Sequence, residues 1–142
     1  MAIVREILED KGYQVETIGP DRRVYDAVAL MAEKGIGALM VVDGDKVVGL
    51  ISERDYARKV ILKGRASKET HVRDIMETRV VYVHPDQTVE ECMAIVTDRR
   101  VRHLPVIEND KLIGLVSIGD LVKSIIDEQK FIIDQLVKYI NS

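Results

Sequence analysis

The sequence carries one pair of side chains twice at the same spacing, a serine followed three residues later by an aspartate. Ser52 precedes Asp55, and Ser117 precedes Asp120. One interpretation is a capping box, in which the serine oxygen accepts a backbone N–H of the first helical turn and the carboxylate reaches back. The other is a binding site. A helix N-terminus suits phosphate, and an ionised aspartate there can accept hydrogen bonds from both hydroxyls of a ribose.

Both motifs belong to an internal repeat. A shift of 65 positions brings Thr17–Ile61 onto Tyr82–Ile126 without a gap. Pro20 falls on Pro85, and apolar character is kept almost everywhere along the match. Such self-similarity at a fixed period indicates a duplicated structural unit. We expect the two copies to form one pseudo-symmetric module.

Each copy predicts an α/β plan in the order strand, helix, two strands, helix. An extended piece opens each copy, at Val15–Ile18 and at Val80–Val83. A helix follows, with apolar residues at i, i+3, i+4 and i+7, and Gly35 is placed to end the first of them. Turn residues at 43–45 and 109–110 predict a hairpin in each copy. The Ser-x-x-Asp motif then begins the last helix of the copy.

The predicted organisation has two repeats with helical additions. It runs as an N-terminal helix in 1–14, a first repeat in 15–64, a linker in 65–79, a second repeat in 80–126 and a C-terminal helix extension in 127–142. The long C-terminal helix should reach from about Asp120 to Ile140 with a broad apolar face. Such a face indicates a partner surface, and packing on its own module is the alternative.

Composition excludes several classes of protein. Hydrophobic residues make up 46% and charged residues 32%, a balance typical of globular domains. No apolar run approaches the roughly 18 residues of a membrane span. The net charge of −3 argues against a nucleic-acid binder. Cys92, the single cysteine, rules out an internal disulfide and predicts a reducing, cytoplasmic setting. The histidines have no metal-ligand spacing, so no metal is expected.

The two repeats resemble the cystathionine-β-synthase (CBS) domain. Each ends its hairpin with Gly-apolar-apolar-Ser-x-x-Asp, at Gly49–Asp55 and Gly114–Asp120. Val101–Val106 is similar to the family's second-strand start, whereas Ile36–Val41 lacks the basic pair and the proline. The resemblance covers about residues 15–126. It implies a stand-alone Bateman module, in which two paired CBS repeats bind adenosine-containing nucleotides in the grooves between them.

The resemblance also implies which residues bind the nucleotide. Asp55 and Asp120 would hold the ribose, with Ser52 and Ser117 near the phosphate or ribose. Arg54 is expected to share a site with Asp120, while Arg102 and His103 would share one with Asp55, since guanidinium groups match phosphate. The alternative for Arg102 is a solvated cation at a helix C-terminus. The candidates around the adenine are Thr17, Ile18, Gly37, Ala38, Tyr82, Val83, Pro105 and Ile118. For Ile18 and Val83 the alternative is a place in the core.

The expected function is sensing of an adenine nucleotide, with AMP, ADP, ATP and NAD(H) as candidate ligands. The signal would pass to a separate, unidentified effector protein. We expect a homodimer, because family members commonly associate into discs of four repeats. Two alternatives remain open, a protein-interaction module with a purely structural nucleotide and a weak nucleic-acid binder. A Ser/His/Asp triad would require an assumed proximity, so no enzymatic activity is predicted.

Overall fold

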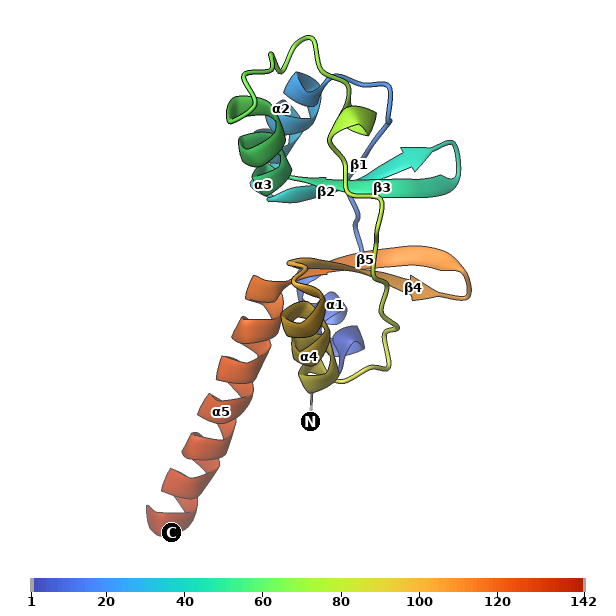
Figure 1. Cartoon of the computed structure of the whole chain (residues 1–142). Coiled ribbons are helices and arrows are strands. Elements are labelled where there is room, and N and C mark those ends of the chain that lie inside the picture. The colour runs from blue at the N-terminus through green and yellow to red at the C-terminus, as the bar shows by residue number, and fades with distance from the viewer. Residues whose placement is uncertain (1, 142) are drawn as a thin grey trace. The chain divides into compact units, whose positions relative to one another are not determined.

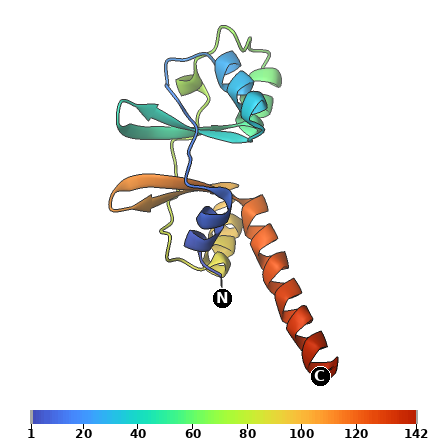
Figure 2. The same ribbon diagram turned by 180° about the vertical axis from the view of Figure 1, so that it is seen from behind.

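The computed structural model describes residues 2–141 and divides them into two compact units (Figures 1 and 2). Unit 1 comprises residues 2–14 and 81–141, and unit 2 comprises Val15–Val80. Each unit packs helices on a small sheet, so the predicted α/β fold is confirmed.

Unit 2 contains the first repeat and a three-stranded sheet. Strand β1 runs parallel to β2, which pairs antiparallel with β3. Helix α3 continues into the π-helical stretch η1, and η2 is a short 3-10 turn. The element bounds are β1 (Thr17–Ile18), α2 (Val24–Lys34), β2 (Ala38–Asp43), β3 (Lys46–Ser52), α3 (Glu53–Tyr56), η1 (Ala57–Ile61) and η2 (Val72–Asp74).

Unit 1 contains the second repeat with both helical additions. Strands β4 and β5 form the predicted hairpin, and the long C-terminal helix α5 is present. Where an extended piece was expected over Val80–Val83, Val83 forms a single parallel bridge with Val106. The element bounds are α1 (Val4–Lys11), α4 (Val89–Arg99), β4 (His103–Glu108), β5 (Lys111–Ser117) and α5 (Ile118–Asn141).

Local signals end and begin these elements as the sequence predicts. Gly35 adopts a left-handed conformation (φ 65°) at the C-terminus of α2, which a glycine reaches without a Cβ penalty. Thr88 caps α4, and Glu91 completes the reciprocal capping box. The apolar side of α4 includes Cys92, which is fully buried. Burial raises the pKa of its thiol to about 11, so the side chain behaves as a small apolar core residue.

The two units are built by a reciprocal exchange of short segments. Helix α1 precedes the first repeat in the chain but packs in unit 1, on the second repeat. The segment around η2 precedes the second repeat but packs in unit 2, where Val72 and Ile75 are buried in the core. The region treated as a linker in the sequence therefore supplies part of the core of unit 2.

Equivalent hydrogen bonds dock the two segments. The N–H of Val4 donates to the carbonyl of Gln87 at 2.9 Å, and the N–H of Val72 donates to that of Arg22 at 2.8 Å. The next residue of each segment donates to a proline: Arg5 to Pro85 at 2.8 Å, and Arg73 to Pro20 at 3.0 Å. Their side chains pair with Asp86 and Asp21. The acceptors are matched positions of the repeat, so the two segments dock in the same way as each other.

Two glycines leave room for these docked segments. A Cβ on Gly49 would lie 2.9 Å from the carbonyl oxygen of Glu77 and 2.9 Å from Sδ of Met76. A Cβ on Gly114 would lie 2.6 Å from Cδ2 of Leu8, which is fully buried. All three distances are shorter than van der Waals contact. The glycines of the two Gly-apolar-apolar-Ser motifs are therefore required for packing.

We predict that Gly49→Ala destabilises the protein by about 1–3 kcal/mol, the usual cost of overpacking a filled site. Two hydrogen bonds hold Glu77 against Leu50, so its carbonyl cannot move aside freely: the Leu50 N–H donates to the Glu77 carbonyl at 2.9 Å, and the Glu77 N–H donates to the Leu50 carbonyl at 2.8 Å. Urea unfolding at neutral pH measures the change. Gly119→Ala is the matched control, because its Cβ would meet Ser117 Oγ only at 3.6 Å. Equal stability of both variants would contradict the packing argument.

Candidate functional site

In unit 2 the first Ser-x-x-Asp motif closes the predicted capping box. The N–H of Asp55 donates to Ser52 Oγ at 3.3 Å, and the N–H of Ser52 donates to Asp55 Oδ2 at 2.9 Å. The Ser52 hydroxyl also donates to Oδ2, at 3.1 Å. The carboxylate is thus held at the N-terminus of α3, with its side chain only 15% exposed.

In unit 1 the second motif repeats this arrangement at the start of α5. The N–H of Ser117 donates to Asp120 Oδ2 at 2.8 Å, and the N–H of Asp120 donates to Ser117 Oγ at 3.1 Å. The capping interpretation is therefore confirmed in both copies. A cap does not exclude a ligand, because a carboxylate offers about four lone-pair sites and the box uses only some of them.

The register of each hairpin places the start of its first strand beside the cap. Ala38 pairs with Ser52 in unit 2, and His103 pairs with Ser117 in unit 1. The residue before each strand accepts a bond from the first residue of the helix. Glu53 donates to Gly37 at 3.0 Å, and Ile118 donates to Arg102 at 2.9 Å. The structure therefore places Gly37 and Ala38 beside the cap of unit 2. It places Arg102 and His103 beside the cap of unit 1.

The remaining candidates divide into core and surface side chains. Ile18 and Val83 lie in the cores of their units, and Pro105 is also buried. Thr17 is exposed, and Tyr82 and Ile118 are 39% and 38% exposed. Burial of the ring raises the pKa of the Tyr82 hydroxyl. The core alternative thus holds for the Ile18 and Val83 side chains.

Each cap aspartate also pairs with a lysine that the sequence did not suggest as part of the site. Lys59 lies 3.3 Å from Asp55 Oδ1 and donates to the Ile75 carbonyl at 2.9 Å. Lys11, from α1, lies 2.7 Å from Asp120 Oδ2 and donates to the Leu115 carbonyl at 2.9 Å. The first pair has the i, i+4 spacing of a helix and could have been read from sequence. The second joins residues 109 positions apart and could not.

The environment of Asp120 sets its charge. Partial burial favours the neutral acid, but the hydrogen bond from Lys11 and the backbone N–H of Ser117 outweigh it. The pKa of Asp120 is therefore below its ordinary value, and the group is ionised at neutral pH. An ionised carboxylate is the form that accepts hydrogen bonds from hydroxyl groups.

The predicted cations fall in different units from their predicted aspartates. Arg54 lies in unit 2 with Asp55, whereas Arg102 and His103 lie in unit 1 with Asp120. Sharing of Arg54 with Asp120, and of Arg102 and His103 with Asp55, stays a prediction.

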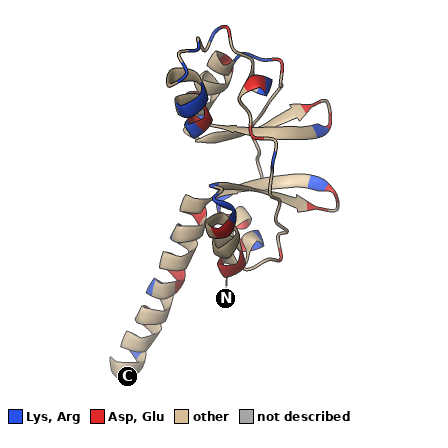
Figure 3. Cartoon of the chain, in the orientation of Figure 1, with Lys and Arg blue, Asp and Glu red and all other residues tan. Residues whose placement is uncertain are grey.

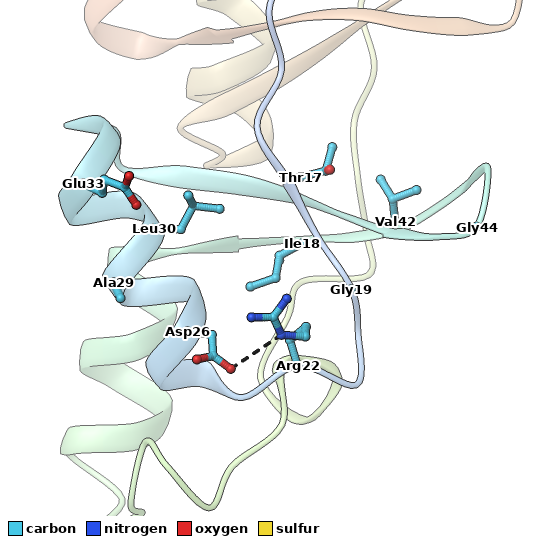
Figure 4. Close-up of a pocket in the computed structure, with 10 residues that line it drawn as sticks. All are labelled: Thr17, Ile18, Gly19, Arg22, Asp26, Ala29, Leu30, Glu33, Val42 and Gly44. Carbon is cyan, nitrogen blue, oxygen red and sulfur yellow. Dashed lines mark ion pairs between the residues drawn. The ribbon is translucent and has the colours of Figure 1, made fainter.

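A hollow in each unit is lined by predicted site residues. In unit 2, Thr17 and Ile18 line a hollow of about 530 Å³ beside the Arg22–Asp26 ion pair, whose atoms lie 3.6 Å apart (Figure 4). In unit 1, Asp120 and Lys11 line a hollow of about 570 Å³ between α1 and α5. Among residues 2–141, no group of three or more His, Cys, Asp or Glu side chains could hold a metal ion. Within the same residues, no helix is long and apolar enough to cross a membrane.

Comparison with known proteins identifies one family. The family model described as CBS domain matches residues 4–62 and 72–127, so both matches begin at a docked segment. The mitochondrial CBS domain-containing protein CBSX3 of Arabidopsis thaliana is 44% identical over 125 residues. That alignment covers 84% of this chain and 61% of the Arabidopsis protein.

Solved structures give the same result. A CBS-domain protein of Burkholderia ambifaria, assigned to signal transduction in its description, superposes with a TM-score of 0.87 at 56% identity, covering 90% of this chain and 96% of that chain. The CBS domain pair of the protein MJ0100, solved with 5-methylthioadenosine and S-adenosyl-L-methionine, has a TM-score of 0.79 at 21% identity. It covers 90% of this chain and 98% of that chain, and at this identity it supports the fold alone.

We predict that Lys11→Met raises the pKa of Asp120 toward 3.8, its ordinary value. Because the pKa of Asp120 is lower in the folded protein than its ordinary value of 3.8, the ionised carboxylate stabilises the fold fully above that ordinary value. This stabilisation is lost as the pH falls through the folded-state pKa. Lys11→Met should therefore cost about 0.2–1 kcal/mol at pH 7, the range for a partly exposed ion pair, and almost nothing in strong acid.

A carboxyl-detected NMR titration would measure the pKa of Asp120. Urea unfolding at pH 7 and in strong acid would measure the change in stability. Lys123→Met is the matched control, because Lys123 pairs with Asp127 and Asp10 in the same unit at exposed positions. An Asp120 pKa that stays low without Lys11 would contradict this assignment and leave the Ser117 cap as its cause.

Proposed function

The chain belongs to the CBS domain family, and we propose that it binds an adenosine-containing nucleotide as a regulatory ligand and passes the signal to a separate protein. AMP is the first candidate, followed by ADP, ATP and NAD(H). One observation carries the proposal. Both Ser-x-x-Asp motifs hold an aspartate at a helix N-terminus in the same geometry, although the two copies differ in the cations around them.

The unused acceptor capacity of these carboxylates supports a ribose contact. In Asp120, both the Ser117 N–H and Lys11 donate to Oδ2. In Asp55, the cap uses Oδ2 and Lys59 approaches Oδ1. A ribose would donate its hydroxyls to the oxygen that faces away from the cap, so the helix would keep its N-terminal hydrogen bonds on binding.

The surroundings of the caps suit the rest of a nucleotide. Gly37 and Ala38 lie beside the first cap, and these small residues let a base approach the backbone. Arg102 and His103 occupy the equivalent place beside the second cap and would contact phosphate. Thr17, Tyr82 and Ile118 would supply exposed surface for the base, while Ile18, Val83 and Pro105 would contribute backbone groups.

Two adenosine-containing molecules bind to the MJ0100 pair, a protein of the same fold. The adenosine portion is also what AMP and NAD(H) have in common, so the proposal rests on the part of the ligand that the caps would hold. Arg54, Arg102 and His103 would contact the rest of the ligand. Denaturing the purified protein and identifying any small molecule it releases would name the ligand directly.

Signalling would proceed by a shift in population. A nucleotide that binds one arrangement of the repeats or subunits more tightly moves the equilibrium by its differential affinity and by no more. We include self-association into a homodimer in this proposal, because helix α5 exposes apolar surface. The cytoplasmic setting stays a prediction, since one relative is named as mitochondrial.

We predict that Asp55→Ala and Asp120→Ala each weaken AMP binding about ten- to a hundredfold at the altered site. Each removes the acceptor for the ribose hydroxyls, a hydrogen bond to a charged group worth about 1.5–3 kcal/mol. Isothermal titration calorimetry with AMP measures the change. Glu91→Ala is the matched control, because Glu91 closes an equivalent capping box with Thr88 on α4.

The control separates the two roles of the aspartate. Glu91→Ala should lower stability as the aspartate variants do and leave AMP affinity unchanged. Wild-type affinity in both aspartate variants would remove the aspartates from the ligand role and leave them as caps only.

We further predict two sites of different preference. Gly119 leaves space where Arg54 stands in the other motif, which would admit a larger ligand such as a dinucleotide on one side. One site should therefore prefer AMP and the other accept NAD(H). Competition of NADH against AMP, repeated with Arg54→Ala and Arg102→Ala, would reveal two classes of site. Equal weakening of both ligands at both sites by each substitution would mean that the sites are equivalent.

A further inference from the structure

The second half of α5 lies exposed on the surface of unit 1. Leu121 is buried and Ile125 packs against the core of unit 1, but every residue from Gln129 to Asn141 is exposed. This part of the helix extends beyond α1 and α4 (Figures 1 and 2). An isolated helix of this length is marginal in water, and its large apolar side chains add a further cost of exposure. The helix therefore needs a cover.

The exposed face of α5 follows a seven-residue repeat. From Val122 to Ile140, positions in alternating steps of four and three are apolar except for Gln129: Val122, Ile126, Gln129, Ile133, Leu136 and Ile140. The five apolar members are between 42% and 76% exposed. We call this set the α5 stripe. In heptad terms Ile126, Ile133 and Ile140 take position a, and Val122, Gln129 and Leu136 take position d, a spacing typical of a coiled-coil seam.

We propose that the α5 stripe pairs with the same stripe of a second copy of the chain, in a parallel and in-register two-helix coiled coil. This inference specifies the surface of the self-association proposed above. Isoleucine at every a position together with leucine at a d position is the combination that favours two parallel strands. The stripe carries no charged side chain, so facing its own copy costs no repulsion.

Charges on the rest of the helix favour the parallel orientation. Figure 3 shows α5 as largely tan with separated charged bands. On one flank of the stripe, in heptad position e, stand Lys123 and Lys130, whereas the other flank, position g, holds Ile125 and Ile132. A parallel pair sets e against g, so neither lysine faces another lysine of the partner copy. An antiparallel pair would set e against e and bring lysines together.

Gln129 favours the in-register alignment. In a parallel pair each d residue lies opposite the same residue of the partner copy. The two Gln129 amides therefore face each other and can form a hydrogen bond. In an antiparallel pair position d meets position a, and the amide would lie against an isoleucine. A single polar residue in the seam sets register and strand number at some cost in stability.

A matched pair of substitutions on the same helix tests the surface. Ile133→Asp places a charge in the stripe, and Phe131→Asp places one at the outermost heptad position, where Phe131 is 64% exposed. Both sites are exposed within the unit, so both variants should fold. Sedimentation velocity over a dilution series should give a dimer for wild type and for Phe131→Asp, with a dissociation constant at least about tenfold weaker for Ile133→Asp.

The outcomes separate this inference from nucleotide binding. A dimer unaffected by Ile133→Asp, or a wild type that stays monomeric at micromolar concentration, would overturn the pairing of α5. AMP titration of the same variants reports on the ligand sites independently. Loss of AMP binding in the aspartate variants together with an intact Ile133→Asp dimer would keep the ligand proposal and reject this one.

Disulfide trapping tests the orientation. Gln129→Cys adds an accessible cysteine to a chain whose Cys92 is buried, with a thiol pKa of about 11. Parallel in-register helices bring the two introduced thiols within bridging distance, and oxidation should yield a covalent dimer. Phe131→Cys, on the outer face, should stay monomeric on a denaturing gel. If a mixture of Gln129→Cys and Ile133→Cys chains cross-linked only to each other, the pair would be antiparallel and the proposal wrong.

Discussion

The structure depends on one constraint, that neither repeat closes its core without a segment from outside itself. Val4–Leu8 completes the second repeat and Val72–Met76 completes the first, each docked by two backbone hydrogen bonds to matched acceptors. Backbone donors that lost these acceptors while buried would each cost about 1–3 kcal/mol. Leu8 and Met76 then press on the hairpins at Gly114 and Gly49, a few residues before each cap. The packing that closes the core thus also sets the position of each Ser-x-x-Asp motif.

The caps show why a structural and a ligand role are compatible in one side chain. Folding uses one oxygen of each aspartate to hold the Ser N–H, which fixes the direction of the carboxylate. In the proposed ligand role the other oxygen would accept the ribose hydroxyls, beside Lys59 at Asp55, and Lys11 keeps the Asp120 carboxylate ionised. A site held rigid by folding does not lose conformational freedom again when a ligand arrives. Capping therefore prepares the geometry that binding would use.

A feature of this structure can be predicted from the sequence when the residues that form it lie close together in the chain. Turns, the end of α2 at Gly35 and the serine caps depend on residues within four positions of one another, and all are present in the structure. The ion pair of Lys11 with Asp120 spans 109 positions and leaves no local pattern. The docked segments did leave a signal. Val4-Arg5-Glu6-Ile7-Leu8 reads like Val72-Arg73-Asp74-Ile75-Met76, but at a spacing of 68 rather than the 65 of the repeat.

The two proposals meet on one helix. Asp120 lies in the first turn of α5, and Lys11 ties it to α1, while the α5 stripe runs along the same helix to Ile140. A ligand hydroxyl at Asp120 would compete with or add to the Lys11 contact, and so bear on how α1 holds the base of α5. Any change in the pairing of α5 caused by nucleotide must be matched by an equal change in nucleotide affinity caused by pairing, because coupling free energies are reciprocal. Under the two proposals, that coupling would let nucleotide binding change the association of subunits.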